Sequence, residues 1–177
     1  DTYYNHKLDN ADSAYQAKDI AEAERIYQEI LDKQPEAAEH LAKMYYEVGK
    51  SHNEELSYLS KLKSLLSNTT FGKDQVSTYL NQLVSHIEKV ADQLFKNQDY
   101  NKAYNYLKAI DLDKRGDSNF AKKSRLYALY VNLNAIEFES SYTSTLSLID
   151  AYCKKDIEKE IEDAIIGTVK KLHKSNK

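Results

Sequence analysis

Apolar residues recur every three or four positions along most of the chain, which is the spacing of an amphipathic α-helix. Similar stripes run over residues 20–31, 41–48, 56–66 and 157–172. No segment alternates apolar and polar residues for long, so the pattern does not favour strands. The longest stripe comprises Val76, Leu80, Leu83, Val84, Ile87, Val90, Ala91, Leu94 and Phe95.

The breaks between these stripes predict an all-α fold of about nine helices joined into antiparallel hairpins. Asp, Ser and Asn stand at many of the breaks, where their side chains can cap a helix N-terminus. One Pro and four Gly in 177 residues leave little turn chemistry for an all-β fold. The predicted helices cover approximately 2–17, 20–33, 36–48, 52–67, 73–97, 100–113, 118–136, 141–153 and 155–173.

The chain matches itself when it is shifted by 80 residues, with small residues on small ones and large residues on large ones. Two antiparallel helices approach closely only where small side chains face each other, while a bulky residue fills the next gap. The match therefore indicates a repeated helical hairpin. The matched pairs are Ala11 and Ala91, Ala14 and Leu94, Tyr15 and Phe95, Asp19 and Asp99, Ile20 and Tyr100, Ala23 and Ala103, Tyr27 and Leu107, and Ile30 and Ile110.

The repeated pattern resembles the tetratricopeptide repeat (TPR) family. The resemblance rests on Ala11, Ala14, Asp19, Ile20, Ala23, Tyr27, Ile30 and Pro35. It implies one TPR-like domain over residues 1–177, whose hairpins stack as a right-handed superhelix. The clearest repeat units are 4–35 and 84–112, and the array is irregular because 80 is not a multiple of the usual repeat length. The predicted helix 155–173 is expected to cap it. A bundle of ordinary amphipathic hairpins is the alternative.

In such arrays the first helix of each hairpin lines a concave groove that binds a peptide or partner protein. The family's known clamp for a peptide carboxylate is not expected, because Leu8 and Asp12 stand where it has Lys and Asn. The 15 tyrosines suit a recognition surface, although packing between helices is the alternative role for each. The groove candidates are Asp9, Asp12, Tyr15, Lys43, Tyr46, Lys89, Asp92, Phe95, Tyr127, Tyr130 and Asn134.

Charge is nearly balanced over the whole chain, with a net charge of −3, but it is uneven along it. Residues 1–40 contain ten acidic and four basic residues, so this part is expected to prefer a basic or polar partner segment. Basic residues gather at 114–125 and at the end of the chain, where they suit helix termini. No stacking aromatics alternate with them, and nucleic acid is therefore not an expected partner.

Catalytic and cofactor signals are missing from the sequence. The five histidines form neither a Glu-x-x-His nor a His-Glu-x-x-His motif, which argues against a metal site. The single Cys153 excludes an internal disulfide, and there is no Gly-rich phosphate loop. No apolar stretch is long enough for a membrane span. We therefore predict a protein that is not an enzyme and needs no cofactor.

The leading prediction is a protein–protein interaction scaffold with a tyrosine-lined groove. One alternative is the soluble part of a bacterial envelope lipoprotein that serves in an assembly or secretion complex. The chain starts without Met, which favours processing and a bacterial periplasm or cell-envelope location over the cytoplasm. Another alternative is a helical bundle that encloses a small ligand.

Overall fold

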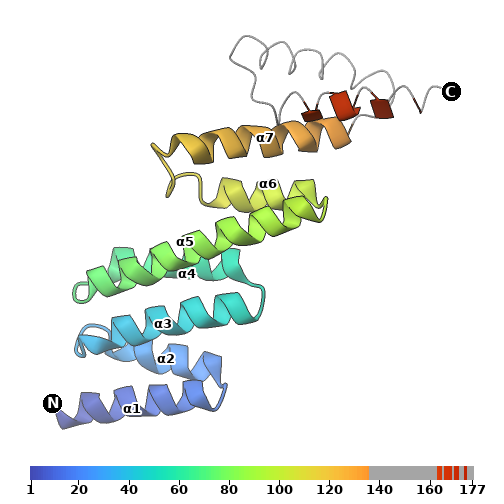
Figure 1. Ribbon diagram of the computed structural model, residues 1–177. Helices are drawn as coiled ribbons and strands as arrows, with labels where there is room; N and C mark the ends of the chain where they lie inside the picture. Colours follow the sequence, from blue (N-terminus) through green and yellow to red (C-terminus); the bar gives the residue numbers. More distant parts are fainter. Residues whose placement is uncertain (136–162, 165, 169, 172–173, 175–177) are drawn as a thin grey trace. The chain divides into compact units, whose positions relative to one another are not determined.

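The computed structural model describes residues 1–135, 163–164, 166–168, 170–171 and 174. The described residues form helices and no strand, which confirms the predicted all-α class (Figure 1). The predicted helix 141–153 lies outside the described residues, as does most of 155–173, although the described residues between 163 and 174 are helical. The helices with defined bounds are α1 (Thr2–Gln16), α2 (Ile20–Ile30), α3 (Glu36–Ser51), α4 (Glu55–Asn68), α5 (Lys73–Lys96), α6 (Tyr100–Ala109) and α7 (Ser118–Asn134).

The chain forms two compact units, which we call the N-terminal unit (Asp1–Ile87) and the C-terminal unit (Glu88–Lys177). The boundary falls within α5, so this helix contributes residues to both. The single domain over 1–177 stays a prediction.

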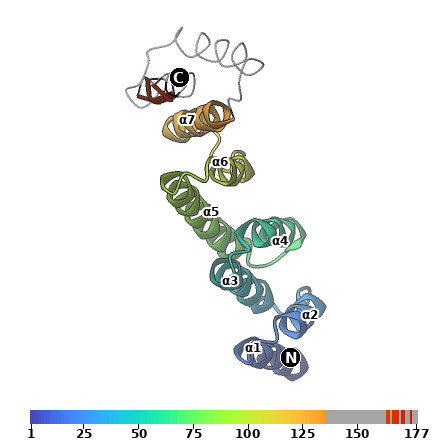
Figure 2. The same ribbon diagram turned by 90° about the vertical axis from the view of Figure 1, so that its right-hand side faces the viewer.

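Helical hairpins build the N-terminal unit in two layers. Helix α1 packs against α2, and α3 packs against α4. Helices α1, α3 and the start of α5 form one layer, and α2 and α4 form the other (Figures 1 and 2). The core between the layers includes Leu8, Ala11, Ala23, Ile26, Tyr27, Ile30, Leu41, Met44, Tyr45, Val48, Leu59, Leu62 and Leu83.

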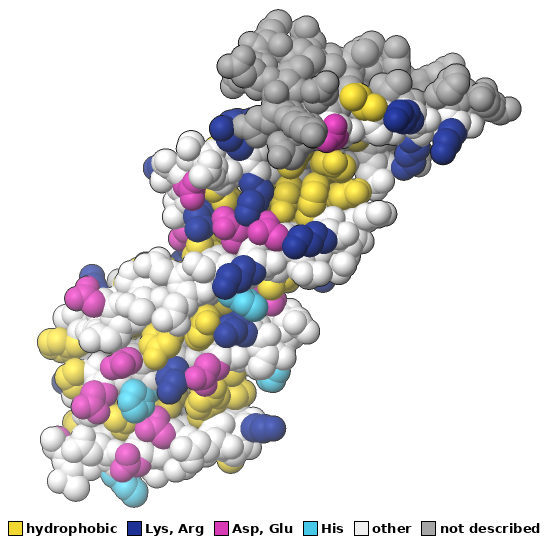
Figure 3. Space-filling model, viewed as in Figure 1, with side chains coloured by type: hydrophobic (Ala, Val, Ile, Leu, Met, Phe, Trp, Pro, Cys, Tyr) yellow, Lys and Arg dark blue, Asp and Glu magenta, His cyan; other side chains and the backbone are white. Residues whose placement is uncertain are grey.

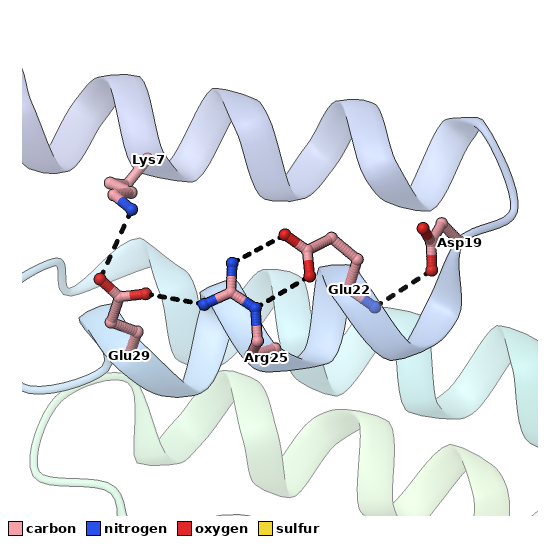
Figure 4. Close-up of polar contacts among 5 residues, drawn as sticks. All are labelled: Lys7, Asp19, Glu22, Arg25 and Glu29. Carbon is pink, nitrogen blue, oxygen red and sulfur yellow. Dashed lines mark hydrogen bonds and ion pairs between the residues drawn. The ribbon is translucent and has the colours of Figure 1, made fainter.

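Ion pairs connect the exposed sides of α1 and α2 (Figure 4). The Arg25 guanidinium donates to both oxygens of Glu22, over 2.7 and 2.8 Å, and this hydrogen bonding holds the pKa of Glu22 below its ordinary value. Arg25 also lies 3.3 Å from Glu29, whose other oxygen is 3.5 Å from Lys7 of α1. At the start of α2, the Asp19 side chain accepts from the Glu22 backbone N–H.

The turns between α1 and α2 and between α5 and α6 have the same backbone geometry. Lys18 and Gln98 are both left-handed, with φ of 64° and 67°. The N–H groups of Asp19 and Asp99 each donate over 2.9 Å to the carbonyl five residues earlier. These turns lie where the hydrophobic pattern predicted breaks, and they stand 80 residues apart.

The C-terminal unit contains the end of α5 together with α6 and α7, and α6 packs against α7. Ile110 and Phe120 are buried on either side of the connection between these helices. A further cluster joins Leu129 and Leu133 of α7 to Ala164, with Tyr130 packed against it.

Four predicted helix boundaries differ from the structure by three or four residues. Helix α2 ends at Ile30, before the predicted end at 33, and α4 begins at Glu55, after the predicted start at 52. The break predicted at Gly49 lies three residues later, at 52–54, because α3 continues to Ser51 and α4 begins at Glu55. A Cβ atom on the buried Gly49 would lie 2.9 Å from the Cβ of Tyr58 on α4, so this glycine allows two helices to approach closely. Helix α6 ends at Ala109, earlier than predicted, and hydrogen-bonded turns follow it up to Asp117.

Candidate binding surface

In the N-terminal unit, two of the groove candidates on α1, Asp12 and Tyr15, are hydrogen-bonded to neighbouring helices. Asp12 accepts from the Tyr27 hydroxyl of α2, and its Oδ1 lies 2.8 Å from Nδ1 of His40 on α3. The Tyr15 hydroxyl donates to Glu47 of α3. Burial, followed by the hydrogen bond to Glu47, raises the pKa of Tyr15 above its ordinary value. These contacts make α1 and α3 one polar surface rather than two separate faces.

The candidates on α3 extend this surface towards α5. Tyr46 is half-buried, its hydroxyl accepts from Lys50 over 3.0 Å, and its ring centroid lies 6.0 Å from that of Tyr79 on α5. Asp9 and Lys43 are exposed. The N-terminal unit therefore presents tyrosine faces beside charged groups, and their role as a binding surface stays a prediction.

In the C-terminal unit, a carboxylate and an aromatic stack join α5 to α7. Asp92 accepts from the Tyr127 hydroxyl over 2.6 Å and from the Lys123 ammonium over 3.1 Å. The Phe95 ring stacks on Tyr127, with a centroid distance of 4.1 Å and an interplanar angle of 5°, and meets Tyr130 edge-on at 4.8 Å. Tyr127 is only 5% exposed, so most of its side chain belongs to the core. Only a small part of it contributes to the surface.

An open hollow of about 490 Å³ lies beside this stack. Figure 3 shows hydrophobic side chains gathered between α5 and α7, with lysine and acidic side chains next to them. Three groove candidates, Asp92, Phe95 and Tyr127, are among the residues of the hollow. The lining residues are Asp92, Phe95, Lys96, Asn119, Lys122, Lys123, Leu126 and Tyr127.

Sequence reasoning did not include the α7 residues of this hollow that precede Tyr127. Asn119, Lys122 and Leu126 follow the i, i+3, i+7 spacing of one helix face, and that spacing was the available signal. The three remaining candidates of this unit do not line this hollow. Lys89 is exposed on α5, and Asn134 lies with Tyr130 in a second hollow of about 170 Å³.

The contacts of α1 with α3 have counterparts between α5 and α7. Asp12 meets His40, and Asp92 meets Lys123. Tyr15 meets Glu47, whereas Phe95 meets Tyr130. On α1 and α5 the matched residues stand 80 positions apart, but on α3 and α7 they stand 83 apart, because the chain connecting α6 to α7 is longer than that connecting α2 to α3.

A further hollow, of about 300 Å³, lies between α2 and α4 in the layer opposite to the candidate groove. Its wall carries an ion pair between Glu24 and Lys61, whose atoms are 2.8 Å apart. The Lys61 ammonium also lies 5.5 and 5.8 Å from the ring centroids of Tyr45 and Tyr58. The sequence did not indicate this hollow, because its residues come from α2, α3 and α4, which are adjacent only in the folded unit.

One carboxylate of the N-terminal unit is buried. Glu55, in the first turn of α4, is 2% exposed, and its Oε1 lies 3.5 Å from Nε2 of His86 on α5. The N-terminal end of a helix favours a negative charge. This contact attaches the start of α4 to α5.

Comparison of the chain with protein-family models, curated proteins and solved structures finds no match. In the part of the chain that the structure describes, no helix is both long and apolar enough to cross a membrane. Among the same residues, no group of three or more His, Cys, Asp or Glu side chains is placed to hold a metal ion.

Proposed function

We propose that this chain is a non-enzymatic protein–protein interaction scaffold that binds a partner protein or peptide on the face of its first helices. The first helices are α1 and α3 in the N-terminal unit and the end of α5 with α7 in the C-terminal unit. The proposal includes the TPR-like stacking of hairpins in a right-handed superhelix, in which these helices line the concave side.

The hollow between α5 and α7 is the observation that carries the proposal. It combines a half-buried aromatic ring, an aliphatic side chain and several amines in one place, which is the composition of a protein-binding surface. The hydrogen bonds of Asp92 to Tyr127 and Lys123 hold its wall in one arrangement before a partner arrives. Preorganised side chains lose less entropy on binding.

The repeated hairpin geometry supports the architectural part of the proposal. The turns at Lys18 and Gln98 share their backbone conformation, and the contacts of Asp12 and of Asp92 are matched in kind. A repeat protein forms its binding surface from successive copies of the same helical hairpin.

Site-specific photo-crosslinking in the source cells tests this function. A photoreactive residue replaces Lys43 or Lys96 on the proposed surface, and Lys18 or Lys102 as matched exposed lysines in a turn and on α6. We expect the same protein to be crosslinked from positions 43 and 96 and not from 18 and 102. Equal crosslinking from all four positions, or none from 43 and 96, would contradict the proposal.

A further inference from the structure

We propose that the hollow between α5 and α7 binds an acidic segment from within a partner protein, and that a large apolar side chain of this segment lies between its carboxylates. The inference rests on the proposed function, because it names the chemistry of the partner on part of the same surface. The amines that line the hollow, the apolar wall beside them and the different residues at the corresponding place in the N-terminal unit support it.

Lysine side chains from two helices line the hollow. Lys96 of α5 and Lys122 of α7 are exposed, and Lys123 of α7 is half-buried. The carboxylate among the lining residues is Asp92, which accepts from the Lys123 ammonium over 3.1 Å and from the Tyr127 hydroxyl over 2.6 Å. Three amines therefore meet one carboxylate, and that carboxylate is already held by an amine and a hydroxyl. This excess of positive charge favours an acidic ligand.

A second carboxylate close to these lysines does not cancel the excess. Glu88 of α5 lies 3.8 Å from the Lys123 ammonium and 3.9 Å from that of Lys114. Glu88 thus adds one negative charge to the group and Lys114 adds one positive charge. Four lysines against two carboxylates leave a formal charge of +2 around the hollow.

The apolar wall gives a large side chain a place to bind. Phe95 and Leu126 are half-buried, so both leave apolar surface on the hollow. The Phe95 ring is held by its stack on Tyr127 and by the edge of Tyr130. The volume of about 490 Å³ lies within the range of about 300–1,000 Å³ of known ligand sites. An apolar anchor surrounded by complementary charges is the usual arrangement at the centre of a protein interface.

The corresponding place in the N-terminal unit has a different chemistry. The matched residues stand 80 positions earlier on α1 and 83 positions earlier on α3. There the three amines are replaced by an amide, a carboxylate and an imidazole, and the aliphatic side chain is replaced by an ammonium. An acidic segment with an apolar anchor is therefore expected to select the C-terminal unit. Gln16, Glu36, Glu39, His40 and Lys43 take the places of Lys96, Asn119, Lys122, Lys123 and Leu126.

The charges also favour a segment within a chain over a chain end. The TPR clamp for a terminal carboxylate has Lys and Asn on its first helix, and the corresponding residues of α5 are Glu88 and Asp92. These carboxylates would repel a terminal carboxylate at that place. The amines of the hollow come instead from Lys96, one turn after Asp92, and from α7. They suit carboxylates on side chains that flank an anchor.

Fluorescence anisotropy of a labelled peptide mixed with the full chain tests the inference. The probe is an amidated peptide in which two glutamates stand on each side of a central phenylalanine. We expect saturable binding that added salt weakens, because charges are screened. Replacing the phenylalanine of the probe with serine leaves its charge unchanged and should weaken binding by at least about tenfold. A free terminal carboxylate on the probe should not strengthen binding.

Charge reversal in the protein makes the test specific to the hollow. Lys96→Glu/Lys122→Glu should weaken binding of the probe by at least about tenfold. The same variant should bind a peptide with lysines in place of the glutamates more tightly than the wild type does. The matched control is Lys18→Glu/Lys102→Glu, at exposed lysines in a turn and on α6, and it should bind the probe as the wild type does.

A leucine pair tests the apolar wall separately. Leu126→Ala removes the aliphatic part of the wall and should weaken binding by at least about fivefold. Leu112→Ala, at a side chain that is 69% exposed and is not among the lining residues, should leave binding unchanged. Circular dichroism verifies that all variants keep their helix content.

A probe that does not bind would overturn the inference, as would equal binding by the wild type and Lys96→Glu/Lys122→Glu. A need for a free terminal carboxylate, or tighter binding of an oligothymidylate by the same lysines, would also overturn it. If the probe fails but one protein is crosslinked from Lys43 and Lys96, the scaffold function stands and only the acidic segment is excluded. If the probe binds as expected but no protein is crosslinked, the chemistry of the hollow stands and the scaffold function fails.

Discussion

The substitution Gly49→Ala tests whether a missing side chain allows α3 to pack closely on α4. Gly49 lies inside α3, and in a helix interior Ala is favoured over Gly by about 1 kcal/mol because Gly loses more backbone entropy on folding. Helix propensity alone therefore predicts that the variant is more stable than the wild type.

Packing predicts the opposite sign. The new Cβ would lie 2.9 Å from the Cβ of Tyr58, and neither atom can rotate away, so the two helices must separate by several tenths of an ångström. Overpacking of this kind costs about 1–3 kcal/mol. Separation also weakens the neighbouring contact of the Tyr45 and Tyr58 rings, whose centroids are 5.7 Å apart. We expect the net effect to lower the free energy of unfolding by about 1–2 kcal/mol.

Urea unfolding followed by far-ultraviolet circular dichroism measures this change as a lower midpoint at constant slope. The matched control is Gly167→Ala, since an added Cβ there meets no atom within 4 Å and the residue is helical. The control should be more stable than the wild type by about 0.5–1 kcal/mol. A Gly49→Ala chain that gains stability as the control does would refute the close-packing explanation.

Three further predictions concern hydrogen bonds, pH and turns. Tyr127→Phe removes the hydroxyl that donates a hydrogen bond to Asp92. It should lower the free energy of unfolding by about 1.5–3 kcal/mol, and urea unfolding measures this change. Burial and a carboxylate partner raise the pKa of Tyr27 and of Tyr127 above 10.0. The contribution of these neutral hydroxyls to the free energy of unfolding should therefore be fully present below pH 10.0 and be lost as the pH rises further. Thermal unfolding across alkaline pH measures this loss. Lys18→Gly and Gln98→Gly should each raise the unfolding midpoint, because glycine relieves the left-handed backbone, and unchanged midpoints would contradict this.

Local periodicity was sufficient to predict the helices from α1 to α7, but it was not sufficient to place every end. The turns at Asp19 and Asp99 were found because an N-cap residue follows a break in the hydrophobic stripe. Gly49 was assigned to a break for the same local reason. Its actual role depends on Tyr58 of another helix, and a single helix pattern carries no information about that contact.

The candidate surface could be predicted in part for a similar reason. The resemblance to the TPR family placed Asp92, Phe95 and Tyr127 together, and the structure brings them into contact. His40 and Lys123, which meet the two equivalent aspartates, were not grouped with them. Pairing them requires a shift of 83 residues, whereas α1 and α5 match at 80, and no single shift of the sequence reveals both.

The longer connection between α6 and α7 has a practical consequence. Asp92 and Phe95 contact α7 at the positions that correspond to the α3 positions contacted by α1. The connection between α6 and α7 is nevertheless longer than that between α2 and α3, so its length does not determine how the helices pack. Gly116, at φ of 89°, has no neighbouring atom within 4 Å of an added Cβ. Exposed connections of this kind accept inserted sequence at a small entropic cost. A fluorophore, an affinity tag or a small folded reporter placed beside Gly116 would therefore leave the helices and their candidate surface intact.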